Sequence, residues 1–186
     1  MVSHIALKES FAVVHALEDG EQVILLRKGG IRDPQGEFQL KHREFLLYPA
    51  AEHAEESFVR SEWRARFQKN TPAAVAGEVE FRVYAGVAWA HPIRDLNALA
   101  GLESHHIWTP EFLEKRMRYR PLEPTLLAVV RAYRLARPIR QAVLPEYAGC
   151  KSWVPLAEPV SLEGAEPVMD NRRFRAALEK ITAVLK

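Results

Sequence analysis

The chain has 186 residues, of which 48% are hydrophobic and 27% charged, and its formal net charge is only +2. These values are typical of a globular domain, and no apolar run approaches the roughly 18–20 residues that span a bilayer. His4, Lys8 and Glu9 interrupt any secretory leader, and the single cysteine excludes an internal disulfide or an all-cysteine metal site. We therefore expect a cytoplasmic protein.

The first 70 residues predict alternating helices and strands. Leu7, Phe11, Val14 and Leu17 recur at spacings of three and four residues, which predicts a helix over 3–20. Turn residues around 29–36 predict a loop after the first strand. The elements expected after the helix are strands at 22–26 and 38–48 and a second helix over 52–69.

The rest of the chain continues this pattern. Alternating apolar residues predict a half-buried strand over 78–90, and another strand is expected over 125–135. Thr109 before Pro110 marks the start of a helix that ends near residue 118, and Asp170 caps a last helix. The whole predicts an α+β fold with a mixed or antiparallel sheet flanked by helices.

We expect one domain over 1–186. The stretch 71–77 reads as a connector, so a subdivision into 1–70 and 78–186 stays open.

Positive charge gathers in one part of the chain. Residues 82–140 hold 10 basic and 5 acidic side chains, and nearly all of the basic ones are arginine. Arginine binds phosphate through two parallel hydrogen bonds and stacks on bases. The plain alternative is an ordinary arginine-rich surface.

Aromatic residues interleave with these cations, which is typical of surfaces that stack bases and hold phosphates. A glycine pair beside Arg27 and Lys28 adds a second phosphate-binding candidate, although the spacing of a nucleotide-binding P-loop is missing. The residues expected to bind nucleic acid are Arg27, Lys28, Trp108, Arg116, Arg118, Tyr119, Arg120 and Lys151.

Three residues are candidates for catalysis. Glu52, His53 and His106 have side chains suited to acid–base chemistry or to binding a metal, but adjacent helical residues point apart, so a site needs partners from elsewhere in the chain. Glu37, Lys41 and Glu44 lack the spacing of a metal-dependent nuclease of the restriction type. We expect no cofactor and no resident metal.

Several short blocks mix aromatic, basic and turn-forming residues. They are Ala6–Glu9, Leu25–Ile31, Phe45–Pro49 with Glu52 and His53, His106–Thr109, Arg116–Pro121, Arg131–Arg134 and Tyr147–Trp153. Together these blocks resemble one bacterial family, catalogued as domain of unknown function 1802. The resemblance covers about residues 5–156, and Ala50–Ala51 depart from the family's bulkier pattern after Pro49.

That family is similar to proteins fused to restriction-endonuclease-like domains. The resemblance therefore implies work on DNA, as a recognition module in a restriction or defence system, with a nuclease as partner protein. The second half also loosely resembles small barrels of the PUA type, including the EVE and ASCH groups, which bind RNA or modified bases.

These observations favour a nucleic-acid-binding module that reads a base or a strand end. A metal-dependent nuclease or hydrolase and a non-catalytic protein-interaction component remain the alternatives.

Overall fold

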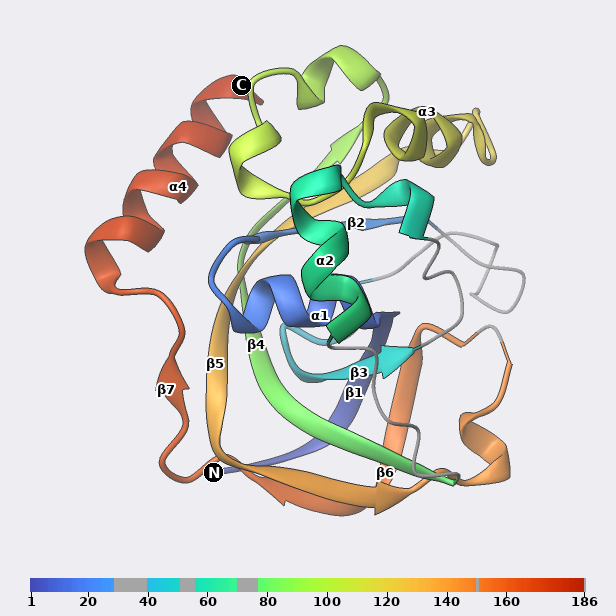
Figure 1. Ribbon diagram of the computed structural model, residues 1–186, viewed down its shortest axis with the longest axis vertical. Coiled ribbons are helices and arrows are strands. Elements are labelled where there is room, and N and C mark those ends of the chain that lie inside the picture. Colours follow the sequence, from blue (N-terminus) through green and yellow to red (C-terminus); the bar gives the residue numbers. More distant parts are fainter. Residues whose placement is uncertain (29–39, 51–55, 70–76, 150, 186) are drawn as a thin grey trace.

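The centre of the molecule is one mixed sheet of seven strands, seen here in a computed structural model that describes residues 1–28, 40–50, 56–69, 77–149 and 151–185 (Figure 1). Strands β1 and β3 run parallel, and the other paired neighbours run antiparallel. The path through the sheet is β2-β5-β4-β3-β1-β6, with β7 beside β5. The strands are β1 (Val2–Ser10), β2 (Ile24–Arg27), β3 (Glu44–Ala50), β4 (Glu78–Ile93), β5 (Thr125–Ala142), β6 (Trp153–Ser161) and β7 (Glu166–Pro167).

Helices cover one end and one side of this sheet. In Figure 1, α1 and α2 lie in front of it, α3 lies at the top, and α4 runs down the left side. This arrangement confirms the predicted α+β class with a mixed sheet flanked by helices. The α-helices of the described part are α1 (Phe11–Glu18), α2 (Ser61–Lys69), α3 (Pro110–Arg118) and α4 (Asn171–Val184).

Both faces of the sheet are buried, each against its own hydrophobic core. Ala6 and Leu7 are neighbours on β1, yet they lie in different cores because successive strand residues point to opposite faces. The larger core contains Leu7, α1 and β2, and one face of α4. The smaller core is rich in aromatic residues and includes Tyr48, Phe81 and Tyr147.

The predicted helix over 3–20 is wrong in its first half, since residues 2–10 form β1. The helical spacing of Phe11, Val14 and Leu17 is real, and all three are buried on α1. Leu7 fits the same spacing only because the strand passes directly into the helix. A buried strand with apolar residues on both faces lacks the alternation that would have identified it.

The predicted strand over 38–48 begins at Glu44 in the described residues. In place of the predicted helix over 52–69, the described part of this stretch has a short 3-10 turn at 56–58 and then α2 from Ser61.

Strand β6 was not predicted. It carries Pro155 and Pro159, which usually argue against a strand, but β6 lies at the edge of the sheet, where a missing N–H is tolerated.

Strands β4 and β5 are longer than predicted and are the two longest strands of the described sheet. They pair antiparallel from Glu78↔Ala142 to Ile93↔Thr125, with register shifts after Phe81 and after Val87. Such irregularities increase the local twist and bend of a sheet, and Figure 1 shows both strands strongly curved. In the described residues no pairing joins the edge strands β2 and β6, so the curved sheet is not closed into a barrel.

Two predicted helix caps are present. Thr109 Oγ1 accepts a hydrogen bond from the Phe112 N–H (3.3 Å) at the start of α3, and Asp170 Oδ1 accepts one from the Arg173 N–H (2.8 Å) at the start of α4. Among the described helices, none is both long and apolar enough to cross a membrane.

The cap at Asp170 yields a stability prediction. We expect Asp170→Ala to lower the free energy of unfolding by about 1 kcal/mol, because the first turn of α4 loses its side-chain acceptor. Urea denaturation followed by circular dichroism measures this change. Asp170→Asn keeps an acceptor oxygen and is the matched control; an equal loss in both variants would show that the cap hydrogen bond is not the cause.

A recessed cationic cluster at the end of β1

Arg27 joins two strands that are far apart in the order of the sheet. It ends β2, whereas β1 lies four steps further along the path. Its Nη1 donates to the carbonyl oxygen of Lys8 and to Glu9 Oε2, both at 3.0 Å. The Arg27 side chain is only 15% exposed. The curved sheet is therefore bridged at the C-terminal end of β1 by a largely buried ion pair.

Two more cations lie at this point. Lys28 is only 6% exposed, and its Nζ donates to the carbonyl oxygen of Met117 at the end of α3 (3.0 Å). Arg116 of α3 is partly buried, with its guanidinium 5.3 Å from the centre of the Phe112 ring. We call Arg27, Lys28, Arg116 and the carboxylate of Glu9 the cationic cluster.

Arg116 interacts electrostatically with the other members of the cluster. Burial lowers the pKa of Lys28, and the nearby positive charge of Arg116 lowers it further, against the opposing effect of Glu123. Burial also lowers the pKa of Arg116, which Glu9 raises and Arg27 lowers. In the described residues, Arg116 has no hydrogen bond or ion pair of its own. Positive charge is thus concentrated where water is largely excluded.

The residues after α3 form a rim beside the cluster. Tyr119 is 44% exposed, and its ring lies 5.6 Å from the guanidinium of Arg120. Arg120 adopts a left-handed backbone conformation (φ 47°) and pairs with Glu123 at 3.3 Å. Arg118 lies further out, 82% exposed and paired with Glu114. The sequence-predicted residues of α3 and its end are therefore at different depths.

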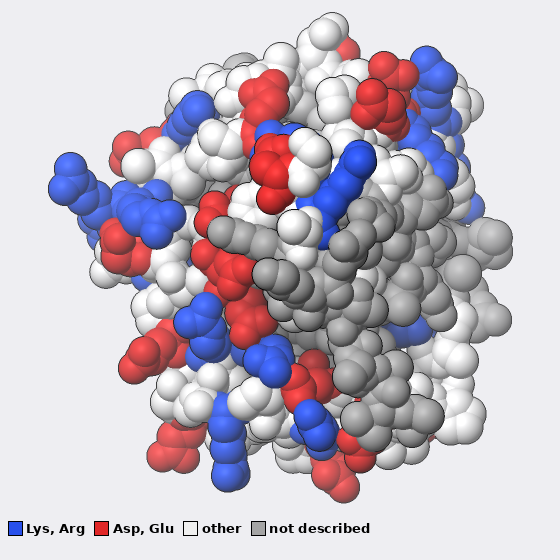
Figure 2. Space-filling view, in the orientation of Figure 1, with Lys and Arg blue, Asp and Glu red and all other residues white. Residues whose placement is uncertain are grey.

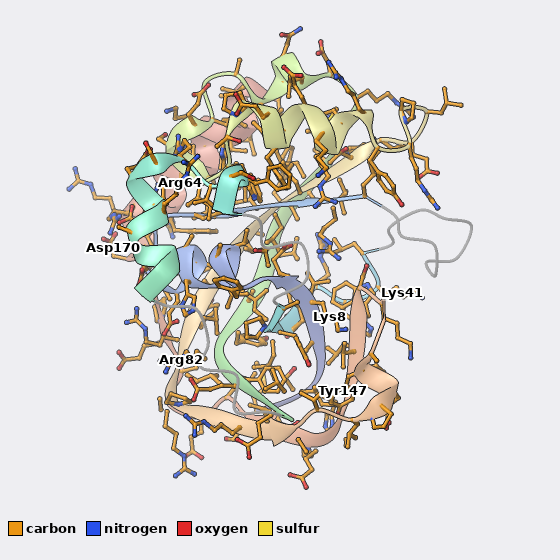
Figure 3. The ribbon with its side chains drawn as sticks, turned by 45° about the vertical axis from the view of Figure 1, so that its right-hand side comes forward. Lys8, Lys41, Arg64, Arg82, Tyr147 and Asp170 are labelled. Carbon is orange, nitrogen blue, oxygen red and sulfur yellow. The ribbon has the colours of Figure 1, made fainter. Side chains whose placement is uncertain are left out.

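Lys151 belongs to the same end of β1. Ser152, its neighbour, accepts a hydrogen bond from the Lys8 N–H (2.9 Å), while Lys151 Nζ donates to the carbonyl oxygen of Glu146 (2.8 Å). Sequence reasoning missed Lys8, whose Nζ donates to Gly149 (3.2 Å) and lies over the Tyr48 ring. It also missed Glu9, although both residues stand in one of the family-like blocks. Figure 3 shows Lys8 between Lys41 and Tyr147 in that view.

A shallow groove lies along the start of β3. His42 contacts the edge of Trp153 (5.0 Å between ring centres), and Leu7 of β1 pairs with Trp153. Trp153 therefore connects the groove to β1, the strand that carries Glu9. The groove is lined by Lys41, His42, Arg43, Glu44, Gly86 and Val87.

Other arginines of 82–140 are paired with acidic residues on the opposite side. Arg82 and Arg140 pair with Glu80, at 2.6 and 2.8 Å, and Arg82 and Arg134 pair with Glu18. Burial raises the pKa of Glu80, but the contacts with Arg140 and Arg82 together outweigh it and hold this pKa below its ordinary value. Figure 2 accordingly shows blue and red side chains intermixed on its left half, and Figure 3 places Arg82 to the left, away from Lys8. This part of the arginine excess is an ordinary ion-paired surface.

Trp108 does not lie on the surface. It is 5% exposed and packs between His106 and Phe112, with ring centres 5.3 and 5.5 Å away. The prediction that Trp108 stacks on a base is therefore at odds with its position, because its ring is buried in the larger core. Trp108 contributes to the cationic cluster indirectly, because it packs against Phe112, whose ring contacts the Arg116 guanidinium.

His106 is buried too, at 2% exposure, and in the described residues neither ring nitrogen has a hydrogen-bond partner. Burial, and secondarily the charge of Arg60, lowers the pKa of His106 to about 4. Glu52 and His53 lie outside the described residues. Across those that are described, no group of three His, Cys, Asp or Glu side chains is placed to hold a metal ion.

Fold and cluster together define an α+β protein with a recessed cationic site at one end of a curved, open sheet. The family model described as "Domain of unknown function (DUF1802)" matches residues 6–180, and the chain belongs to this family. The resemblance predicted from the sequence is thereby confirmed, and it extends into α4.

No curated protein matches the chain significantly. Among solved structures, the chain is similar to the ZmASCH S128A mutant protein from Zymomonas mobilis, at 10% identity and a TM-score of 0.44, over 79% of this chain and 94% of that one. Its name contains ASCH, one of the PUA-type groups expected above, but a likeness this low supports no conclusion about function.

The bridge between β2 and β1 can be tested by a double-mutant cycle with Arg27→Met and Glu9→Gln. We expect each single variant to lose about 3 kcal/mol of stability, because it leaves a partly buried charge without its partner. The double variant should lose less than the sum of the two, with a coupling of about 1–3 kcal/mol measured by urea denaturation. Simple additivity would contradict a direct ion pair.

The buried His106 predicts a dependence of stability on pH. The unfolded state, with a histidine pKa near 6.5, binds more protons than the folded state, where the pKa is about 4. The free energy of unfolding should therefore fall as the pH drops from 7 to 5, by about 2 kcal/mol from this residue. His106→Phe keeps the stacking on Trp108 and should remove this component. A variant with the wild-type slope would show that other groups cause it.

Proposed function

We propose that this protein binds nucleic acid through the cationic cluster and its rim, as a reader of a base or a strand end. The observation that carries the proposal is the excess of positive charge in a desolvated place. Arg116 lies within electrostatic reach of both Arg27 and Lys28, and Glu9 is the carboxylate that pairs with Arg27. Such an arrangement is unfavourable until an anion enters, because like charges repel most strongly where water is excluded.

The rim supports nucleic acid over other anions. Tyr119 offers an exposed aromatic face beside Arg120, and stacking on such a face stabilises any base. Lys41 and Arg43 are exposed beside the groove, and Lys8 adds positive charge on the other face of β1, where it lies over Tyr48 and near Lys151 in the chain segment 149–151. In the proposed complex the cluster holds a phosphate, the rim holds a base, and the outer lysines and arginines, including Arg118, contact further phosphates.

The resemblance to proteins fused to restriction-endonuclease-like domains is what supports DNA as the nucleic acid, a restriction or defence context and a nuclease partner. These points belong to the proposal and rest on that resemblance alone. RNA is the main alternative, and the binding experiment includes it.

The experiment is fluorescence anisotropy with single- and double-stranded DNA and RNA oligonucleotides, with and without modified bases, at several salt concentrations. We expect micromolar or tighter binding that weakens as salt rises, since bound phosphates release counterions. Arg116→Gln should weaken binding and reduce the salt slope by about 0.7–0.9, as expected for one lost phosphate contact. Absence of binding to every oligonucleotide at low salt would overturn the proposal.

The matched control is Arg137→Gln. Arg137 is an exposed arginine on β5, eight residues beyond the part of that strand that pairs with β2. It should leave both the affinity and the salt slope unchanged. A similar loss in both variants would indicate attraction by overall charge and no defined site, and cleavage of the probe in magnesium would favour the nuclease alternative.

A further inference from the structure

The depth of the cluster limits which phosphate can reach it. Lys28 is 6% exposed and Arg27 15%, and Arg116 is partly covered by the ring of Phe112. A phosphodiester inside a strand is attached to sugar on both sides, so both flanking nucleotides would have to enter with it. A terminal phosphate is attached on one side only. It can reach buried groups while the rest of the strand stays outside.

The charge of the cluster also favours a terminal phosphate. Counted over the described residues, three cations and one carboxylate leave a formal charge of +2. The nearby Arg120–Glu123 pair adds nothing to this balance. A phosphomonoester carries close to two negative charges at pH 7, whereas a phosphodiester carries one. Only the monoester neutralises the cluster, and neutralisation matters most where solvent screens least.

The hydrogen-bonding groups also suit a compact dianion. The Arg27 Nη1 is held by Lys8 and Glu9, which fixes the plane of its guanidinium. Across the residues that the structure describes, the contact of the Arg116 guanidinium is with the Phe112 ring and leaves its N–H groups for a ligand. A phosphate group offers three terminal oxygens to these donors and to the Lys28 ammonium. Tyr119 then lies beside the cluster, within electrostatic reach of Arg116, where the first base can stack.

We infer that the cationic cluster is a site for a phosphomonoester, the phosphorylated end of a nucleic-acid strand. This inference rests on the proposed function and adds to it the chemical group that is recognised. Discrimination comes from the depth and charge of the cluster, and the rim binds the adjoining nucleotide.

The test compares five probes of one sequence by anisotropy competition. They are an oligonucleotide with a 5′-phosphate, one with a 3′-phosphate, one with hydroxyl groups at both ends, one whose 5′-phosphate carries a methyl ester, and the corresponding nucleoside monophosphate. We expect one phosphorylated end to bind about tenfold or more tightly than the hydroxyl ends. The methyl ester, a monoanion of similar size, should lose most of that advantage.

Variants assign the preference to the cluster. Arg116→Gln should remove most of the advantage of the phosphorylated end, whereas Arg137→Gln should keep it in full. Arg116 has no ion pair in the described residues, so its loss should leave the fold intact, which circular dichroism verifies. A preference that survives Arg116→Gln would place the phosphate elsewhere and overturn the inference.

The outcomes separate the two proposals. Salt-sensitive binding that is equal for phosphate and hydroxyl ends would overturn the phosphomonoester site and keep the nucleic-acid function. A nucleoside monophosphate that competes as well as the phosphorylated oligonucleotide would keep the phosphomonoester site and overturn the nucleic-acid function. No binding of any probe would overturn both.

Discussion

The arrangement of this protein depends on how a curved sheet that does not close is held at its open side. Strand β2 and strand β1 are separated by three strands in the path of the sheet, and no backbone pairing joins them in the described residues. Arg27 spans the gap from the end of β2 to Lys8 and Glu9. In a closed barrel a ladder of backbone hydrogen bonds joins the two edges of the sheet, whereas here the Arg27–Glu9 ion pair joins β2 to β1. It therefore places charged groups in the interior, where a closed barrel would have apolar ones.

Once Arg27 is fixed there, the charge of its surroundings is unusual. The Arg27–Glu9 ion pair has no net charge, and Lys28 and Arg116 add two positive charges beside it. Repulsion between partly buried like charges amounts to a few kcal/mol at an effective dielectric constant of about 20. The fold tolerates this because other interactions hold each added cation, namely the carbonyl of Met117 for Lys28 and the ring of Phe112 for Arg116. On the opposite side, three arginines share two glutamates, and water screens them because they are exposed.

The sequence predicted the fold class, both helix caps and most elements, because these depend on local patterns. Thr109 and Asp170 act through residues three positions away, and the stripe of α1 spans two turns. It failed at β1 and β6, where burial on both faces and edge prolines remove the usual alternation. The exposure of individual side chains could not be predicted from the sequence either. Trp108 and Tyr119 both lie within the arginine-rich part of the chain, but only the three-dimensional core determines that Trp108 is covered and Tyr119 is open.

Lys8 and Glu9 illustrate why the site was only partly predicted. Glu9 matters because β2 returns to it from the other edge of the sheet, a contact between residues 18 positions apart that no periodicity indicates. Contacts that only the folded chain makes also give the buried aromatic residues a part in positioning Arg116. His106, Trp108 and Phe112 stack in one column that runs from the core to Arg116. The column fixes the ring on which the guanidinium rests, so the packing of the core determines the position of the least constrained cation. Trp108, which was predicted to stack on a base, is instead part of the support of the Arg116 guanidinium, whereas Tyr119 keeps an exposed ring.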